Sequence, residues 1–260
     1  MNRRNTFFAL LATAAVALMA PAVQAADPLR VGVSAGYPPF DVLNADGSLG
    51  GFDVDYSNLL CERMNRKCEF VNIEWDGIIP GLLAKKFDII VSSMGINEER
   101  MKQVDFSEPY YKGPSALIAK KSVDFKADEA GTTGKAIGLQ RASAHECYMK
   151  KHMGKADMRQ YATPEEAYLD LQAGRIDAVL VDTIPAQEWL KSDPKNAEVF
   201  APVNADLYDM ECFGVGNGIA LRKGEDVLKG ELNAAIKKTR DDGSYLALSN
   251  KYFGRDIYGN

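Results

Sequence analysis

The stretch DVDYSNLLCERMNRKCEFVNIEWDGIIPGLLAKKFDIIVSS, residues 53–93, decides the fold class. Apolar residues recur at helical spacing over residues 53–65 and alternate as in a strand over residues 68–75. A short helix at residues 78–86 then leads into the buried strand FDIIVSS. With a strand at residues 29–35 before it, this β-α-β-α-β order predicts an α/β fold with a mostly parallel sheet covered by helices.

A second series of strands and helices follows the first. Strands are predicted at residues 115–121, 135–140, 157–162, 176–182 and 218–225. Helices are predicted at residues 143–153, 164–175 and 184–192, with two closing helices that are split at Asp242 and Gly243. No fixed-period repeat and no low-complexity linker separates the two series. The sequence therefore predicts two α/β lobes, with the chain crossing between them.

The first 25 residues are expected to be a secretory signal rather than part of the fold. Arg3 and Arg4 form a positive start, residues 7–19 are apolar, and small residues precede a cleavage site after Ala25 or Ala26. No later stretch has the length and hydrophobicity of a membrane helix. Without Arg3 and Arg4 the chain has 29 basic and 36 acidic residues, a net charge of −7. This charge disfavours nucleic acid and anionic membranes as partners, and we expect a soluble periplasmic protein.

An even number of cysteines in an exported chain indicates disulfides. The four cysteines are Cys61, Cys68, Cys147 and Cys212. Cys61 and Cys68 flank a short helix-to-strand loop and are expected to pair, whereas Cys147 and Cys212 either form a second disulfide or stay free. A zinc site is disfavoured because His145 and His152 are the only histidines and no CxxC spacing occurs. We expect no metal and no cofactor.

Polar residues stand where several predicted strands end. Ser92 and Ser93 follow one buried strand, Gln140 ends another, and Asp182 ends a third. Ligands of open α/β sheets bind beyond the carboxyl ends of the strands. The sequence therefore predicts a ligand site at these ends.

Six segments of the sequence resemble those of a known protein family. They are GYPPF (36–40), GFDVDYSNLLCERM (51–64), EWDGIIPGLLAKKFDIIVSSMGINEER (74–100), VDFSEPYY (104–111), DLQAGRIDAVLVD (170–182) and DDGSYLALSNKYF (241–253). In this order the chain resembles the periplasmic amino-acid-binding proteins of ABC importers, family 3, and most closely the branch that binds lysine, arginine, ornithine and histidine. The Cys61 and Cys68 pair also resembles the disulfide of that branch.

The resemblance implies a type II periplasmic-binding-protein fold, in which two lobes joined by two hinge strands close over one amino acid. Hinge crossings are expected near residues 112–115 and 209–215. Lobe 1 would comprise residues 26–113 and 214–260, and lobe 2 residues 114–213. The implied partners are an amino acid, bound as a small molecule, and, transiently, a membrane-embedded ABC permease, with the protein itself expected to be a monomer.

An amino acid needs a cation for its carboxylate and an anion for its ammonium. The resemblance implies that Arg100 holds the carboxylate, since a guanidinium matches it with two hydrogen bonds. From the residues alone, Arg100 could instead be an exposed helix arginine that balances Glu98 and Glu99. Asp182 would take the ammonium, and its alternative role is to cap the helix that follows.

Small polar residues would complete the site. Ser93 is expected to contact the head group, while Ser92 points to the opposite face of the strand and is the weaker candidate. Ser143 opens a helix whose free N–H groups favour a carboxylate. Gly95 and Ala144 stand where the family commonly has hydroxyl residues, so the backbone serves at Gly95.

The ligand's side chain is expected to lie between Tyr37 and Trp75, because aromatic faces hold both methylenes and cations. Each could instead be a core aromatic. Asp53 is expected either to meet a basic side chain or to cap its own helix. Ser34 stands where lysine-binding members carry an aspartate, which disfavours lysine and keeps arginine, histidine, ornithine, glutamine and opines as candidates.

Two other functions stay open. The same fold resembles periplasmic cyclohexadienyl dehydratases, in which His145 or Glu146 could act as the general acid. The alternative for both residues is an ordinary place on a helix surface. A sensor domain would need a membrane segment or signalling domain that the sequence lacks. We expect a binding protein rather than an enzyme.

Overall fold

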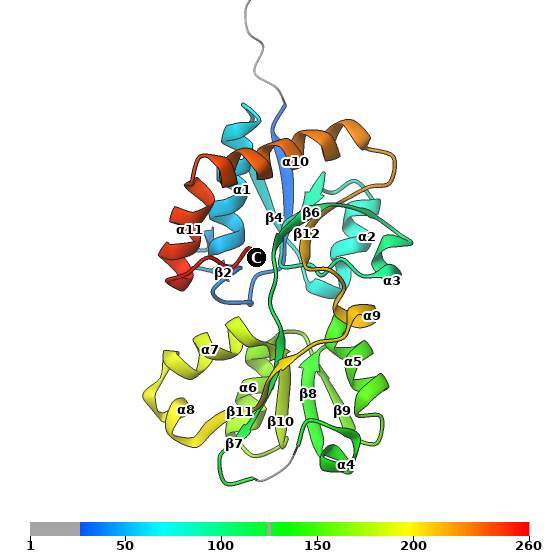
Figure 1. Cartoon of the computed structure of the whole chain (residues 1–260), viewed down its shortest axis with the longest axis vertical. Coiled ribbons are helices and arrows are strands. Elements are labelled where there is room, and N and C mark those ends of the chain that lie inside the picture. The colour runs from blue at the N-terminus through cyan, green and yellow to red at the C-terminus, as the bar shows by residue number, and fades with distance from the viewer. Residues whose placement is uncertain (1–26, 124–125, 260) are drawn as a thin grey trace, which may run out of the picture.

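The computed structural model describes residues 27–123 and 126–259. The predicted signal peptide, residues 1–25, lies outside the described residues. Two lobes, each built around a five-stranded sheet with helices on both faces, follow each other along the long axis of the molecule (Figure 1). Within the described part of the chain no helix has both the length and the hydrophobicity needed to cross a membrane.

The first lobe has five strands in the order β4-β1-β5-β12-β6. They are β1 (Leu29–Val33), β4 (Cys68–Asn72), β5 (Ile89–Ile90), β6 (Asp105–Tyr111) and β12 (Asn217–Leu221). A small hairpin joins β2 (Val42–Leu43) to β3 (Leu49–Gly50). Helices on one face are α1 (Phe52–Arg63), α10 (Asp226–Asp241) and α11 (Ser244–Phe253), and the other face carries the 3-10 turn η1 (Trp75–Gly77), α2 (Ile78–Leu83) and α3 (Glu98–Met101).

The second lobe has its strands in the order β11-β7-β10-β8-β9. They are β7 (Ser115–Lys120), β8 (Ala136–Gln140), β9 (Asp157–Tyr161), β10 (Ala178–Asp182) and β11 (Phe200–Leu207). The helices are α4 (Glu129–Thr132), α5 (Ala144–His152), α6 (Pro164–Gln172), α7 (Thr183–Ser192), α8 (Pro194–Val199) and α9 (Met210–Phe213). Successive residues of a strand point to opposite faces of the sheet, so the core of this lobe has two parts. On one face Leu117 and Leu180 pack with Met149 of α5. On the other face Ile118 and Val179 pack with Leu171 of α6.

Both sheets are mixed rather than mostly parallel. The strands β4, β1 and β5 are parallel, as are β10, β8 and β9, which confirms the predicted α/β class. The remaining pairs, β12 with β5 and β6, and β7 with β10 and β11, are antiparallel. Neither β6 nor β11 was predicted, because Pro109 and Pro202 argue against a strand at these positions. Both are edge strands, where proline is tolerated.

The chain passes between the sheets at two places. Residues 112–114 connect β6 to β7, and residues after β11 return through α9 to β12. The carboxyl-terminal segment lies at the first crossing, where the Lys112 N–H donates to the Ile257 carbonyl at 3.2 Å. The exact lobe boundaries after residues 113 and 213 stay predictions.

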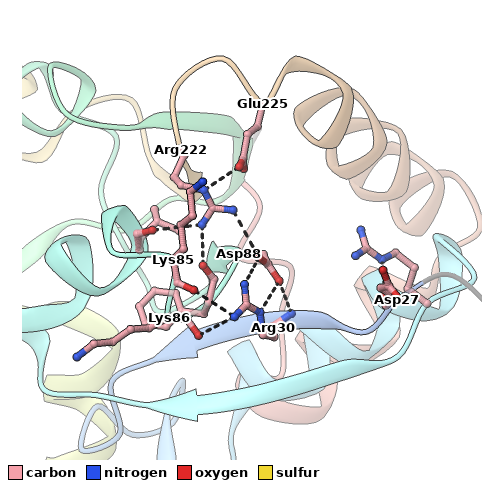
Figure 2. Close-up of polar contacts among 10 residues, drawn as sticks. Asp27, Arg30, Lys85, Lys86, Asp88, Arg222 and Glu225 are labelled. Carbon is pink, nitrogen blue, oxygen red and sulfur yellow. Dashed lines mark hydrogen bonds and ion pairs between the residues drawn. The ribbon is translucent and has the colours of Figure 1, made fainter.

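An ion-pair network joins the three central strands of the first lobe at the edge away from their polar ends (Figure 2). Arg30 of β1 contacts both carboxylate oxygens of Asp88, at 2.7 and 3.0 Å. Arg222, just after β12, reaches the same carboxylate at 3.4 Å, the Phe87 carbonyl at 2.7 Å and Glu225 at 2.7 Å. Because one carboxylate joins β1, β5 and β12, the network fixes their alignment.

Two disulfides are formed. Cys61–Cys68 confirms the predicted pair. Cys147 and Cys212, for which pairing was left open, are also bonded, and this bond ties α9 to α5 just before the second crossing.

Candidate ligand-binding site

A cavity of about 410 Å³ lies between the lobes, where the polar strand ends of both sheets meet. The predicted site residues that line it are Ser34, Tyr37, Trp75, Ser93, Gly95, Arg100, Gln140, Ser143 and Asp182. Ser92, Ala144 and His145 line it as well, and the chain crossings contribute Lys112, Asp206, Tyr208, Phe213 and Asn217. The crossings expected near residues 112–115 and 209–215 include Lys112 and Phe213, but only the folded topology shows that these side chains reach the cavity. Asp53 is absent from the lining.

Arg100 is a buried cation, with 8% of its surface exposed. Its place is set by Asn97, which caps α3 by accepting the Arg100 N–H at 3.0 Å and donates to the Cys212 carbonyl at 2.8 Å. The guanidinium donates one bond to the Gly95 carbonyl at 3.1 Å and lies 5.2 Å from the centre of the Trp75 ring. The alternative of an exposed helix arginine is therefore wrong.

Arg100 keeps its charge despite this burial. Burial lowers the pKa of the guanidinium to about 10, while Asp182, followed by Glu99, acts in the opposite direction. Its hydrogen bond to Gly95 is the one that its side chain makes within the described residues. The remaining N–H groups of the guanidinium thus have no acceptor in the described part of the chain, as expected for a group that binds an anion.

Asp182 is an anion held by three donors. The Tyr37 hydroxyl donates to it at 2.5 Å, Ser115 Oγ donates at 3.0 Å, and His145 Nε2 lies 3.1 Å away. Burial would raise the pKa of this carboxyl, but His145 and the hydrogen bonds outweigh it and hold the pKa below its usual value. Asp182 stands at the N-cap position of α7 without making a side-chain cap bond, so its carboxylate serves the cavity side.

His145 was expected on a helix surface, and this is a correction. Its side chain is buried, and Nε2 lies 3.0 Å from Ser115 Oγ in addition to its contact with Asp182. Its position directly after the predicted helix start was the available signal. Glu146, in contrast, does not line the cavity. It accepts the Ala142 N–H at 3.2 Å and pairs with Lys150.

The start of α5 offers unused donors. Ser143 occupies the N-cap position, yet its hydroxyl makes no cap bond. Its Oγ is buried without a hydrogen-bond partner among the described residues. A buried hydroxyl without a partner costs free energy. Together with the free N–H groups of the first turn, this side chain suits a ligand oxygen.

Tyr37 and Trp75 reach from the first lobe to the second. The Tyr37 hydroxyl contacts Asp182, and Trp75 Nε1 donates to the Ala142 carbonyl at 3.1 Å. Next to Trp75, Asp76 accepts from Arg141 at 2.5 Å. Direct contacts of this kind between the lobes place them in a closed arrangement around the cavity.

Asp53 neither caps its helix nor lines the cavity. Gly51 is the N-cap of α1, and the Asp53 carboxylate is fully buried. It accepts from Ser93 Oγ at 2.9 Å and from the Tyr110 hydroxyl at 2.8 Å. Asp53 therefore lies directly behind the cavity wall.

Ser92 also departs from its expected place. Ser93 adopts a left-handed backbone (φ 50°), which interrupts strand alternation. As a result both serines reach the lining. Ser92 Oγ accepts the Ser34 N–H at 3.0 Å, which holds the two strand ends together.

Gly95 is constrained by its neighbours. A Cβ atom at this position would lie 2.9 Å from the Phe213 carbonyl oxygen. A hydroxyl side chain therefore needs the second crossing to move. The side chain of Gln140 is held within the protein, because its amide nitrogen donates to the Ala162 carbonyl at 2.9 Å.

Two α/β lobes that enclose a polar cavity, with a buried cation and a half-buried anion on its walls, define a two-lobed ligand-binding protein. The described residues include no cluster of histidine, cysteine, aspartate and glutamate suited to a metal ion. Residues 29–255 match the model of the bacterial extracellular solute-binding proteins, family 3, and the chain belongs to that family. The predicted family resemblance is confirmed.

The chain is also similar to individual proteins that bind amino acids. The chain is 40% identical to the L-arginine-binding protein of Pseudomonas aeruginosa, over 97% of this chain and 98% of that protein. It is 37% identical to the histidine-binding periplasmic protein of Salmonella typhimurium, over 89% of each. Among solved structures, an ancestral arginine-binding protein bound to arginine superimposes with a TM-score of 0.82 at 34% identity, covering 89% of this chain and all of that chain (100%).

Proposed function

We propose that this protein binds a polar or basic L-amino acid, of the arginine, histidine, ornithine or lysine class, in the periplasm and delivers it to an ABC permease. One observation carries the proposal: buried Arg100 and half-buried Asp182, from opposite lobes, line one cavity. A zwitterion matches both charges at once, whereas a neutral or singly charged ligand leaves Arg100 or Asp182 without an opposite charge from the ligand. Because the charges sit on different lobes, such a ligand favours closure.

The neighbouring groups extend these roles. The ligand carboxylate lies at Arg100, with Ser143 and the first turn of α5 as further donors. The ligand ammonium lies at Asp182 and Ser93. Tyr37 and Trp75 flank the ligand side chain, and cations favour aromatic faces. The arginine- and histidine-binding relatives support a basic ligand, while Ser34 and Gln140 also suit the amide of glutamine.

The site supports binding without chemistry. His145 presents the same nitrogen, Nε2, to both Ser115 and Asp182. A catalytic triad instead uses opposite ring nitrogens for the nucleophile and the acid. We propose that His145 holds Asp182 in place, and that the protein is a monomeric carrier and not a dehydratase. Incubation with prephenate and arogenate tests this directly, and aromatic product would overturn it.

An opine, an amino acid with a carboxyalkyl group on its nitrogen, is the second candidate. The cavity extends from Arg100 to the first crossing, where Lys112 lines it and its ammonium makes no hydrogen bond or ion pair with other described residues. A second ligand carboxylate would suit this ammonium.

Calorimetry of protein that has been unfolded and refolded to remove bound ligand tests both candidates. We expect saturable binding of at least one basic or polar L-amino acid, and stronger binding of octopine than of arginine if the opine assignment holds. Absence of binding by all twenty amino acids and by octopine at millimolar concentration would contradict the proposed function.

A further inference from the structure

Two buried carboxylates lie behind the part of the cavity wall that Ser92 and Ser93 form. Asp41, in the loop after β1, and Asp53, in the first turn of α1, are both fully buried. Neither lines the cavity. A buried carboxylate is costly, and two near each other cost more, so apolar packing alone does not account for them.

These carboxylates fix the direction of two hydroxyl protons. Ser93 Oγ donates to Asp53 at 2.9 Å, and Ser92 Oγ donates to Asp41 at 2.6 Å. A serine hydroxyl has a single proton, so each oxygen can offer the cavity only lone pairs. The Tyr110 hydroxyl fastens this geometry, since it donates to the second oxygen of Asp53 at 2.8 Å and accepts the Ser93 N–H at 3.1 Å.

We propose that Asp53 is a positioning residue that makes Ser93 an obligate hydrogen-bond acceptor and thereby selects ligands with a protonated amine at the α-carbon. The inference rests on the proposed function and deepens it. Asp182 is also an acceptor that lines the same cavity, and in this proposal the ligand nitrogen contacts both Asp182 and Ser93. A primary or secondary ammonium has at least two N–H donors and satisfies both. An α-hydroxyl has one donor and leaves Ser93 facing a lone pair.

A capping or packing role does not explain why residue 53 is a charged carboxylate. Asn97 shows that a polar side chain in this lobe can hold backbone groups without a charge. Within the described residues Asp53 accepts side-chain hydrogen bonds from two hydroxyls, and the one from Ser93 reaches the cavity wall. An ionised acceptor makes the stronger bond and permits one orientation of the serine proton. An asparagine permits both orientations.

The test compares Asp53→Asn with Asp55→Asn, which makes the same charge change in the same turn of α1 and lies on the side of Lys251 and Tyr252. Calorimetry measures the dissociation constants of L-arginine and its α-hydroxy analogue, or of whichever amino acid the wild type binds and its analogue. We expect Asp53→Asn to weaken the amino acid about tenfold and to leave the hydroxy acid unchanged or improved. Asp55→Asn should keep the wild-type ratio of the two constants.

Ser93→Ala provides a second arm in case Asp53→Asn fails to fold. We expect it to lose the same discrimination, and the double variant to discriminate no worse than Ser93→Ala alone, because Asp53 acts through Ser93. Equal weakening of both ligands by Asp53→Asn, or full discrimination in Ser93→Ala, would overturn the inference and leave the proposed function standing. A wild type that binds no amino acid or opine would overturn the proposed function itself.

Discussion

At the scale of single residues, Arg100 has the largest expected effect on affinity. Replacing it by methionine keeps the volume of the side chain and removes the charge, so a bound carboxylate loses its partner. We expect at least a 100-fold rise in the dissociation constant, and a large rise for Arg100→Lys too, since an ammonium cannot make the paired bonds of a guanidinium. Calorimetry measures it, with Arg159→Met on the surface as the control. A change below threefold would contradict the role of Arg100.

Asp53 makes a separate prediction for stability against pH. Burial raises the pKa of its carboxyl from 3.8 to about 6, with the bonds from Tyr110 and Ser93 acting against it. Between these values the folded protein holds a proton that the unfolded chain has released, so the contribution of Asp53 to the free energy of unfolding falls as pH rises from about 4 to 6. The same sign holds for Asp41, whose pKa is raised by burial and by Asp53.

We expect Asp53→Asn to remove part of this slope, on the order of 1–3 kcal/mol between pH 4.5 and 7.5. Urea unfolding of the wild type and the variant at both pH values measures the difference, and Asp55→Asn serves as the control. The groups that face Asp53 are Asp41, Tyr56, Tyr110, Tyr111 and Tyr245. An identical slope in Asp53→Asn and the wild type would show that Asp53 titrates normally.

At the scale of elements, one exposed ion pair joins the two lobes. Arg141 follows β8 and contacts Asp76 of η1 at 2.5 Å. Because the contact requires closed lobes, we expect Arg141→Ala and Asp76→Ala each to speed ligand dissociation by about two- to fivefold, without changing the stability of either lobe. The double variant should dissociate no faster than either single one. Stopped-flow tryptophan fluorescence measures the rate, and an effect that persists in 1 M salt would argue against an ion pair.

The network around Asp88 belongs to the first lobe alone. Replacing Arg222 by alanine leaves Asp88 and Glu225 with fewer partners and frees the Phe87 carbonyl. We expect a loss of about 2 kcal/mol in the free energy of unfolding and no change in ligand affinity. Urea unfolding and calorimetry measure the two quantities, with Lys223→Ala as the neighbouring control. If Arg222→Ala is fully folded in the assay and its ligand affinity still changes, the ion-pair network influences the cavity.

For the whole molecule, the sequence predicts the local order of helices and strands, the α/β class and the family. Strand-end polarity placed Ser93, Gln140 and Asp182 at the cavity edge, because the carboxyl ends of parallel strands converge. The antiparallel edge strands β6 and β11 were not predicted, because each contains a proline, which normally argues against a strand. The burial of His145 and the contact of Asp53 with Ser93 depend on packing between distant segments, which no local pattern encodes.

The central claim is that one zwitterion bridges Arg100 of the first lobe and Asp182 of the second. A crystal structure with the bound amino acid tests it most directly. We predict the ligand carboxylate at about 3 Å from the Arg100 guanidinium and its ammonium at about 3 Å from the Asp182 carboxylate, with the lobes closed. A ligand that contacts a single lobe, or whose head group lies away from both charges, would contradict the account.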